Sequence, residues 1–306
     1  MVIRPIAPSD HPALEAEVNR ARLAGEFRGS SDPEAKFFML SFDFAPSPMA
    51  GAFDADGDLV GFISPEFKVV VVRPEDRRHG IGRALVEAGV AIERERGRPN
   101  LLLGVLPADE ASLAFLRATG FGFHSTLWDL ELPDARSVSP PAWPAGYVAR
   151  PFERERDARS WANLFNAAFA DHPTPLQIDD IEAMESGPPE PGFEDADTLL
   201  LEDVPSGDLV GFCATTPERS EGVVGPDAEI WTIGVRPDRQ GRGLGRQLLR
   251  WGVERLRGVG ARHVSLSVNG RNEGALGLYL SEGFVRSRTR DRWARPVETG
   301  AASEIR

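Results

Sequence analysis

The sequence repeats itself once along its length, and this internal duplication limits the fold more than any other feature. Residues 66–83, EFKVVVVRPEDRRHGIGR, align without gaps to residues 229–246, EIWTIGVRPDRQGRGLGR. Upstream, the five residues 58–62, DLVGF, recur at 208–212. Because the repeat period is about 150 residues, each copy is long enough to form a domain, and a solenoid of short repeats is excluded.

Each copy predicts the same succession of elements. An opening strand and a helical stretch come first, followed by two strands, a central strand, a glycine-rich loop and a long helix. A buried strand, a short helix and a last strand complete the copy. This order is typical of a mixed α/β sheet with helices on its faces. The paired ranges are 12–23 and 158–170 for the first helices, 101–106 and 263–268 for the buried strands, 111–119 and 273–282 for the short helices, and 121–132 and 284–294 for the last strands.

The repeat predicts two tandem α/β domains, at residues 1–133 and 147–296. Residues 134–146 lie between them and are rich in proline, which predicts a semi-rigid linker. Residues 297–306 are expected to form a frayed tail. The second copy differs from the first by an insertion around residues 218–227.

A glycine-rich loop follows the central strand of the second copy. The β-branched stretch 230–235 ends at Arg236-Pro237, and the loop 240–245, QGRGLG, opens a segment with apolar residues at helical spacing. Glycines let a ligand approach the backbone closely, and the first N–H groups of a helix have no partner within the helix. Together with the helix dipole they form a site suited to a pyrophosphate. At this point a simple helix cap in an ordinary α/β unit is an open alternative.

Two familiar phosphate-binding loops do not fit. A Walker loop has a lysine after its last glycine, but Lys36 and Lys68, the two lysines of the chain, both precede this loop. A dinucleotide-binding loop needs a third glycine three positions after the second, and Leu248 or Arg246 stands there, depending on the starting glycine. The pattern that remains is Gln-x-x-Gly-x-Gly, from Gln240 onward.

This pattern resembles the pyrophosphate loop of the GNAT superfamily of N-acetyltransferases. Residues 272–284 also match, because they read Asn-x-x-Ala-x-x-Leu-Tyr-x-x-x-Gly-Phe, like the GNAT motif that follows the fifth strand. The resemblance implies two tandem GNAT-like domains with acetyl-CoA or another acyl-CoA as cofactor, held by the loop and by the fourth strand. The residues that it assigns to this binding are Ile233, Val235, Gln240, Gly241, Arg242, Gly243, Leu244, Gly245, Arg246 and Asn272.

The resemblance also implies a reaction, the direct transfer of an acyl group from a thioester to a primary amine. A lysine-like amine has a pKa near 10.4 and must lose a proton before it attacks. Glu229 matches a position where family members keep a base, and Asp227 and His263 are alternative bases. Glu229 could equally be an exposed carboxylate with no catalytic role. Tyr279 matches the family's general acid, because a phenol stays protonated at pH 7 and can donate to a thiolate. A tyrosine that only packs beneath the loop is the alternative.

The first copy departs from these motifs. Leu116 stands at the position of Tyr279, and Asp109 replaces Asn272. We therefore predict that the first domain is catalytically degenerate, with a structural or regulatory role, although its loop keeps two glycines. The residues that would form a second CoA site there are Val70, Val72, Arg77, Arg78, His79, Gly80, Ile81, Gly82 and Arg83.

The composition limits the classes of molecule that the protein is expected to bind. A net charge of −12 and dispersed arginines argue against nucleic acid and favour a cationic small-molecule or peptide amine. The sequence has neither an apolar run long enough for a membrane helix nor the apolar core of a signal peptide, so we expect a cytoplasmic enzyme without a membrane partner. The single cysteine, Cys213, excludes an internal disulfide, and the histidines lack metal-ligand spacing, so no metal is expected.

The sequence alone is compatible with more than one function. The two-domain layout is similar to that of mycothiol synthase, whose acceptor is the cysteinyl amine of a pseudo-disaccharide, while an antibiotic, a polyamine or a peptide would also supply an amine. A catalytically silent acyl-CoA sensor belongs to another class. Leu116 permits that reading for the first half, whereas Tyr279 argues against it for the second. The sequence does not predict an oligomeric state.

Overall fold

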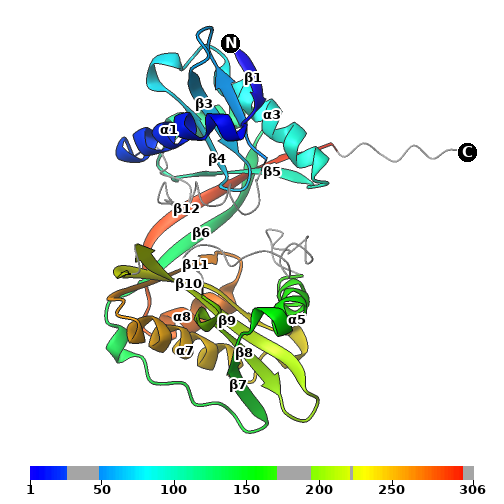
Figure 1. The fold of residues 1–306 in the computed structure, drawn as a ribbon, viewed down its shortest axis with the longest axis vertical. Coiled ribbons are helices and arrows are strands. Elements are labelled where there is room, and N and C mark those ends of the chain that lie inside the picture. The colour runs from blue at the N-terminus through cyan, green and yellow to red at the C-terminus, as the bar shows by residue number, and fades with distance from the viewer. Residues whose placement is uncertain (26–47, 171–193, 221–222, 299–306) are drawn as a thin grey trace, which may run out of the picture. The chain divides into compact units, whose positions relative to one another are not determined.

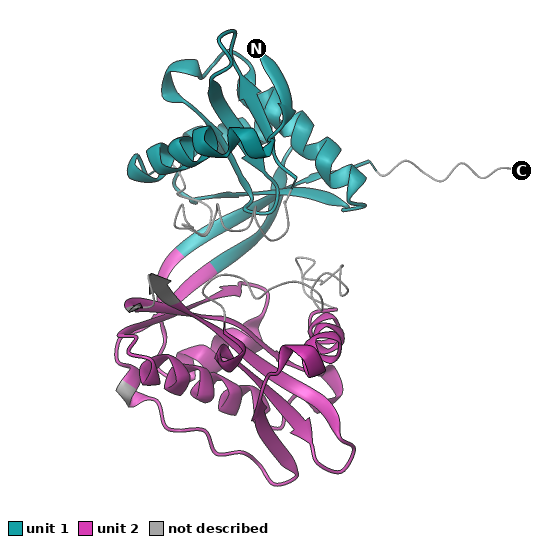
Figure 2. Cartoon of the chain, in the orientation of Figure 1, with its two compact units in different colours: residues 1–127, 289–306 teal, residues 128–288 magenta. Residues whose placement is uncertain are grey.

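The computed structural model describes residues 1–25, 48–170, 194–220 and 223–298. Its chain divides into two compact units, coloured separately in Figure 2. Unit 1 comprises residues 1–127 and 289–306, and unit 2 comprises residues 128–288. These bounds differ from the predicted 1–133 and 147–296, because the last strand of each repeat begins in one unit and ends in the other.

Unit 1 contains an antiparallel sheet of four strands in the order β1-β2-β3-β4 (Figure 1). Helix α3 covers one face, where its buried Leu85 and Val90 share a core with Ile63. Helix α1 covers the other face, where Leu14 meets Phe62, because neighbouring residues of a strand point to opposite sides. The elements of the first repeat are β1 Val2–Pro5, α1 His11–Leu23, β2 Ala50–Phe53, β3 Leu59–Ser64, β4 Val69–Val72, α3 Ile81–Glu95, β5 Asn100–Val105, α4 Glu110–Ala118 and β6 Gly122–Leu132.

Unit 2 repeats this arrangement with longer central strands. The insertion predicted around residues 218–227 extends one hairpin, so that β9 and β10 have 13 residues each, against 6 and 4 in β3 and β4. The predicted mixed α/β architecture is therefore confirmed in both repeats. The elements of the second repeat are β7 Tyr147–Pro151, α5 Arg154–Ala168, β8 Thr198–Asp203, β9 Asp208–Ser220, β10 Val223–Val235, α7 Leu244–Gly258, β11 His263–Asn269, α8 Glu273–Ser281 and β12 Val285–Pro296.

The two repeats exchange their last strands. Strand β12 ends the second repeat but pairs antiparallel with β5 of the first, from Asp291 opposite Val105 to Pro296 opposite Asn100. Strand β6 ends the first repeat but lies beside β11 of the second, in the strand order β5-β12-β6-β11. Each unit therefore depends on a strand that the other repeat supplies, and Figure 2 shows both strands changing colour along their length.

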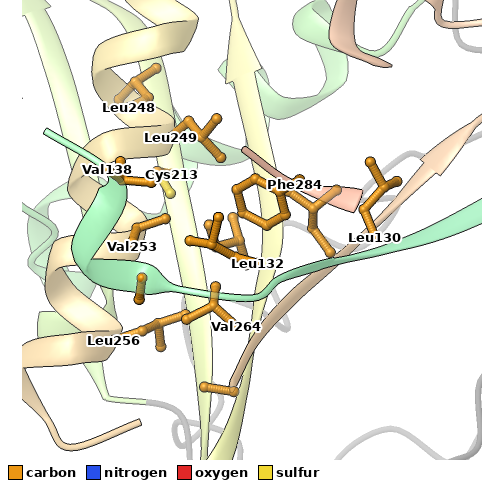
Figure 3. Close-up of a cluster of buried hydrophobic side chains, with 14 of the residues drawn as sticks. Leu130, Leu132, Val138, Cys213, Leu248, Leu249, Val253, Leu256, Val264 and Phe284 are labelled. Carbon is orange, nitrogen blue, oxygen red and sulfur yellow. The ribbon is translucent and has the colours of Figure 1, made fainter. Parts of the chain in front are cut away.

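Core packing shows the same exchange. Leu130 and Leu132 of β6 are buried in the core of unit 2, beside Phe284 (Figure 3). Trp293 of β12 is buried in the core of unit 1. Cys213 of β9 lies fully buried in the unit 2 core, and burial raises the pKa of its thiol far above the ordinary value.

Leu130→Ala is expected to destabilise unit 2, although Leu130 belongs to the first repeat. Its side chain is 0% exposed, and truncating a buried leucine to alanine costs about 2–5 kcal/mol of unfolding free energy. Amide hydrogen exchange should therefore quicken in α7 and stay unchanged in α3. Leu85→Ala in α3 is the matched control and should show the reverse pattern. Faster exchange in α3 alone for Leu130→Ala would contradict the strand exchange.

Candidate active site

Strands β10 and β11 of unit 2 separate soon after they meet. They pair in parallel over three positions only, which join residues 227–229 to residues 263–265. Beyond Glu229, β10 continues to Val235 and pairs with β9 alone. In the described structure, the β11-facing edge of this stretch therefore has no ladder partner. Its peptide groups can pair with an extended ligand, because backbone N–H and C=O groups require hydrogen-bond partners.

A β-bulge lies at the start of the separated stretch. The register between β10 and β9 shifts between Ile230 and Thr232, which isolates Trp231. Ile230 packs in the core on the α7 side, whereas Trp231 stacks on Phe165 of α5, with ring centroids 6.1 Å apart and an interplanar angle of 20°. Bulges re-aim side chains and are common beside active sites. Here the bulge keeps an indole on the α5 side of the sheet, 49% exposed.

The glycine-rich loop leaves the N-terminus of α7 uncovered by side chains. Gly241 and Gly243 have φ values of 74° and 78°, in the left-handed region that favours glycine. Gly243 is the N-cap of α7 and supplies no side-chain cap. A Cβ added at either residue would meet no atom within 4 Å. Protein atoms therefore leave the space beside these two glycines unfilled, next to the first turn of the helix, and an anion site at a helix start requires such space.

The loop, the end of β10 and helix α8 come together around Gly245. A Cβ added there would lie 3.7 Å from Leu278 of α8 and 3.9 Å from Val235 of β10. The side chains of Ile233 and Val235 are partly buried and pack against the core, while their backbone groups lie on the stretch of β10 that has no ladder partner on the β11 side. The structure thus brings the predicted loop, strand and helix positions into one region of unit 2.

Several predicted cofactor-binding side chains are engaged by the protein itself. Gln240 Nε2 donates to the carbonyl oxygen of Val235 at 3.1 Å, which ties the loop to the strand. Arg242 Nη1 donates to the hydroxyl oxygen of Tyr147 at 3.4 Å. Asn272 is the N-cap of α8, where its Oδ1 accepts the Ala275 N–H at 3.1 Å. These side chains shape the loop and the helix ends, and Leu244 is buried beneath them.

Arg246 and Arg250 of α7 both bind the carboxylate of Glu282, just after α8. The Glu282 side chain is 5% exposed. Burial alone raises the pKa of Glu282, but hydrogen bonds from both arginines outweigh burial and hold the pKa below its ordinary value. This ion-pair cluster fixes α8 against the first turns of α7. Glu282 was not among the predicted site residues, although two arginines four residues apart on a helix share one face and can bind one carboxylate.

Tyr279 lies on α8 and is half-buried against the core of unit 2. Its ring centroid is 6.2 Å from that of Phe284. Burial, with a smaller contribution from Cys213, raises the pKa of the Tyr279 phenol above its ordinary value. Within the described residues its hydroxyl has no hydrogen-bond partner. The phenol therefore stays protonated at neutral pH and can donate its proton to a ligand.

The acidic candidates lie next to one another along the paired part of β10. Glu229 is half-buried at the last parallel pair, opposite Ser265. Asp227 pairs with His263 instead, with Oδ1 and Nδ1 2.7 Å apart and side-chain exposures of 69% and 72%. Solvent surrounds that pair, so Glu229 is better placed beside the separated strands.

Unit 1 preserves the loop geometry without the phenol. Arg78 and Gly80 adopt φ values of 67° and 84°, matching Gly241 and Gly243, and Gly80 is the N-cap of α3. Leu116 is buried at the position of Tyr279. The other predicted second-site residues have these places: Val70 and Val72 pack on the core, Arg77 Nε donates to the Val72 carbonyl at 2.9 Å, His79 Nδ1 lies 3.2 Å from the Asp76 carbonyl, Ile81 is buried, a Cβ at Gly82 would lie 3.1 Å from Phe115, and Arg83 Nη2 donates to the Ala118 carbonyl at 3.0 Å.

Other kinds of site are not seen in the part of the chain that the structure describes. Among those residues, no cluster of three or more histidine, cysteine, aspartate or glutamate side chains could hold a metal ion. No described helix is both long and apolar enough to cross a membrane.

Comparison with known proteins finds one family match in each repeat of the chain. A model of the Acetyltransferase (GNAT) family matches residues 18–121 and 158–284. The chain is 33% identical to a mycothiol acetyltransferase of Sanguibacter keddieii, over 84% of this chain and 82% of the relative. It is 36% identical to one from Thermobispora bispora, over 76% of this chain and 78% of the relative.

Two solved structures share the fold. A GCN5-related N-acetyltransferase from Sphaerobacter thermophilus is 21% identical, with a TM-score of 0.67 over 97% of this chain and 95% of the other. A tandem GNAT protein from the clavulanic acid biosynthesis pathway is 20% identical, with a TM-score of 0.66 over 97% and 98%. At these identities the likeness concerns the fold alone.

Proposed function

The chain belongs to the acetyltransferase (GNAT) family as an acyltransferase with two such domains in tandem, and on this premise we propose that unit 2 is its active half. Unit 2 transfers an acetyl group from acetyl-CoA to a primary amine while both substrates are bound. The observation that carries the proposal is the separation of β10 from β11 after Glu229, next to the open loop at Gly243.

In this proposal acetyl-CoA lies along features already described. Its pyrophosphate accepts hydrogen bonds from the N–H groups at the start of α7, where the helix dipole favours negative charge. Its pantetheine arm pairs with the backbone of β10 between Ile230 and Val235, where the strand lacks a ladder partner on one side. The thioester then lies near the bulge at Trp231.

The reaction needs three groups, and unit 2 offers a candidate for each. Glu229 takes the proton from the acceptor ammonium, directly or through one water. Backbone N–H groups of β10 near the bulge stabilise the oxyanion that forms on the thioester carbonyl. Tyr279 donates its proton to the departing thiolate, because its raised pKa keeps it protonated.

The acceptor is a small-molecule or peptide amine in the cytoplasm. The matching relatives named mycothiol acetyltransferases favour the cysteinyl amine of a pseudo-disaccharide over an antibiotic, polyamine or peptide amine. Net charge supports a cationic acceptor. The test measures release of the CoA thiol with one amine of each class. Turnover with the cysteinyl amine alone supports the narrower proposal, whereas no turnover with any amine favours the silent sensor.

Glu229→Gln is expected to reduce turnover by about 10–10²-fold at pH 7 and by more at lower pH. At low pH the acceptor amine is more fully protonated, so loss of a base there has the larger effect. The measurement is the pH profile of kcat/KM between pH 6 and 9. Asp227→Asn is the matched control, because Asp227 lies two residues away in an exposed pair with His263. If Asp227→Asn shows the larger loss, the base has been assigned to the wrong carboxylate.

A further inference from the structure

Lys68 stands in unit 1 where the two central strands separate. It directly precedes β4, and in the repeat alignment it matches Trp231 of unit 2. Its φ of 59° lies in the left-handed region, which is uncommon for a residue other than glycine. Its carbonyl oxygen accepts the N–H of Gly104 at 2.9 Å, which links the start of β4 to β5. Past this point β4 and β5 belong to different sheets.

The surroundings of Lys68 favour its neutral amine. Burial and the guanidinium group of Arg292 lower the pKa of Lys68 to about 8, with Arg98 acting in the same direction and Glu66 and Glu93 against it. At pH 7, about one in ten such amines is neutral, against about four in ten thousand for an ordinary lysine. The Nζ also donates to the backbone carbonyl of Glu66 at 2.9 Å, which holds it beside the strand.

Unit 1 keeps a loop that fits the pyrophosphate of acetyl-CoA. Arg78 and Gly80 reproduce the backbone conformation of Gly241 and Gly243, even though Arg78 has to adopt a positive φ to do so. A Cβ added at Gly80 meets no atom within 4 Å. The loop opens a helix of 15 residues, α3, whose first N–H groups are available to an anion. Lys68 thus occupies in unit 1 the alignment position of Trp231, near which the thioester is proposed to lie in unit 2.

We propose that Lys68 is a self-acetylation site, to which unit 1 transfers the acetyl group of acetyl-CoA held on its own loop. The Nζ lone pair attacks the thioester carbonyl carbon, and the carbon–sulfur bond breaks. The thiolate of CoA leaves and takes up the proton that the amine loses. The products are Nε-acetyl-lysine and CoA. The step shares its acetyl donor with the proposed function but uses none of the catalytic residues of unit 2.

A single event of this kind does not need an efficient catalyst. Leu116 replaces the phenol in unit 1, so we expect slow transfer without turnover on external amines. The lowered pKa supplies a gain on the order of 10² in neutral amine, and the loop supplies proximity. Unit 1 would thus keep the GNAT fold and use acetyl-CoA as its donor, but the acceptor would be its own lysine side chain.

The test incubates the full chain with isotope-labelled acetyl-CoA and follows the label by peptide mass spectrometry. The sequence contains Lys36 and Lys68 as its only lysines, so Lys36 is an internal reference. We expect the Lys68 peptide to gain label at least about 10-fold faster than the Lys36 peptide. The rate should rise with pH up to about pH 8 and then level off. Equal rates for the two lysines would overturn the proposal.

Variants identify which unit performs the transfer. Gly80→Glu should slow labelling of Lys68 to the rate of Lys36, while Gly97→Glu should not. Gly97 is the matched control, because it lies past the other end of α3, has a φ of 67° and would likewise meet no atom within 4 Å. Unchanged labelling in folded Gly80→Glu would mean uncatalysed acetylation from solution and would reject the assigned site. Labelling lost in Tyr279→Phe would mean transfer by unit 2, which also rejects it.

Lys68→Arg separates this proposal from the proposed function. The variant should gain no label at position 68 and keep amine turnover by unit 2, because Lys68 belongs to unit 1. If the wild-type chain acetylates external amines but never labels Lys68, only the self-acetylation fails. If it labels Lys68 but acetylates no amine, the self-acetylation stands and the proposed function fails.

Discussion

Gly243→Glu is expected to weaken acetyl-CoA binding by unit 2 at least about 10²-fold, and turnover should disappear at ordinary acetyl-CoA concentrations. The new carboxylate would lie at the N-cap of α7, where the pyrophosphate is proposed to bind. Two negative groups would then compete for the same N–H donors. Each hydrogen bond to a charged group is worth about 1.5–3 kcal/mol, so losing one or two of them accounts for this loss of affinity.

The measurement is calorimetric titration of the full chain with acetyl-CoA, together with the KM for acetyl-CoA. The whole chain is needed, because the second repeat alone would lack β6, whose Leu130 and Leu132 complete the core of unit 2. Gly260→Glu is the matched control. Gly260 follows the other end of α7, has a φ of 102° and would meet no atom within 4 Å. Equal affinities for the two variants would reject the loop as the pyrophosphate site.

The repeat and the periodicity predicted most of the elements, because those signals are local. Apolar residues at helical spacing marked the long helix after the loop, and its observed bounds are Leu244–Gly258. The last strands were expected at 121–132 and 284–294 and are found at Gly122–Leu132 and Val285–Pro296. The mixed α/β architecture with two GNAT domains is confirmed by the structure and by the family match.

The exchange of the last strands could not be predicted in this way. A strand's alternation specifies which residues face a core, but it does not specify which of two similar cores that is. The alternation of Leu130 and Leu132 is compatible with the core of either repeat, because both repeats predict the same order of elements. Only the pairing of β12 with β5 and the core around Leu130 reveal the exchange.

For the candidate site, backbone features were more predictable than side-chain roles. The positive φ values of Gly241 and Gly243 agree with the argument from glycine. By contrast, the side chains of Gln240, Arg246 and Asn272 bind other protein groups. A motif preserves residue types for folding as well as for binding, and a single sequence does not separate the two. Their roles toward acetyl-CoA therefore remain predictions.

The bulge at Trp231 was missed for a related reason. The run from Ile230 to Val235 reads as an uninterrupted strand, and nothing in its residue types marks the register shift. A bulge is set by how two strands pair, so it depends on β9 as much as on β10. The strand separation, in turn, depends on where β11 leaves β10, after Ser265.

Tyr279→Phe is expected to lower turnover by roughly 10²–10⁴, the usual contribution of a general acid. The change removes one hydroxyl and keeps the ring that packs near Phe284, so the fold should survive. Affinity for acetyl-CoA should change much less, because the loop and the β10 backbone supply most of that binding in the proposal. Single-turnover kinetics with saturating acetyl-CoA measure the chemical step separately from product release.

The pH profile adds a second readout. Because burial raises the pKa of Tyr279 above its ordinary value, the phenol stays protonated through the neutral range. The wild-type rate should therefore show no loss from Tyr279 ionisation below about pH 10. A fall in the wild-type rate near pH 8 that Tyr279→Phe abolishes would contradict the raised pKa.

Tyr147→Phe is the matched control, since Tyr147 is the only other tyrosine in the sequence. Its hydroxyl oxygen accepts a hydrogen bond from Arg242 of the loop, so its loss tests for an indirect effect on the loop. We expect that variant to change turnover less than about 10-fold, because the hydrogen bond from Arg242 is long, at 3.4 Å, and lies at an exposed site where water can replace it. If folded Tyr279→Phe retains wild-type single-turnover rates, the phenol is not the acid. The thiolate would then leave without a proton from α8, and Tyr279 would be a core residue of the CoA-binding fold.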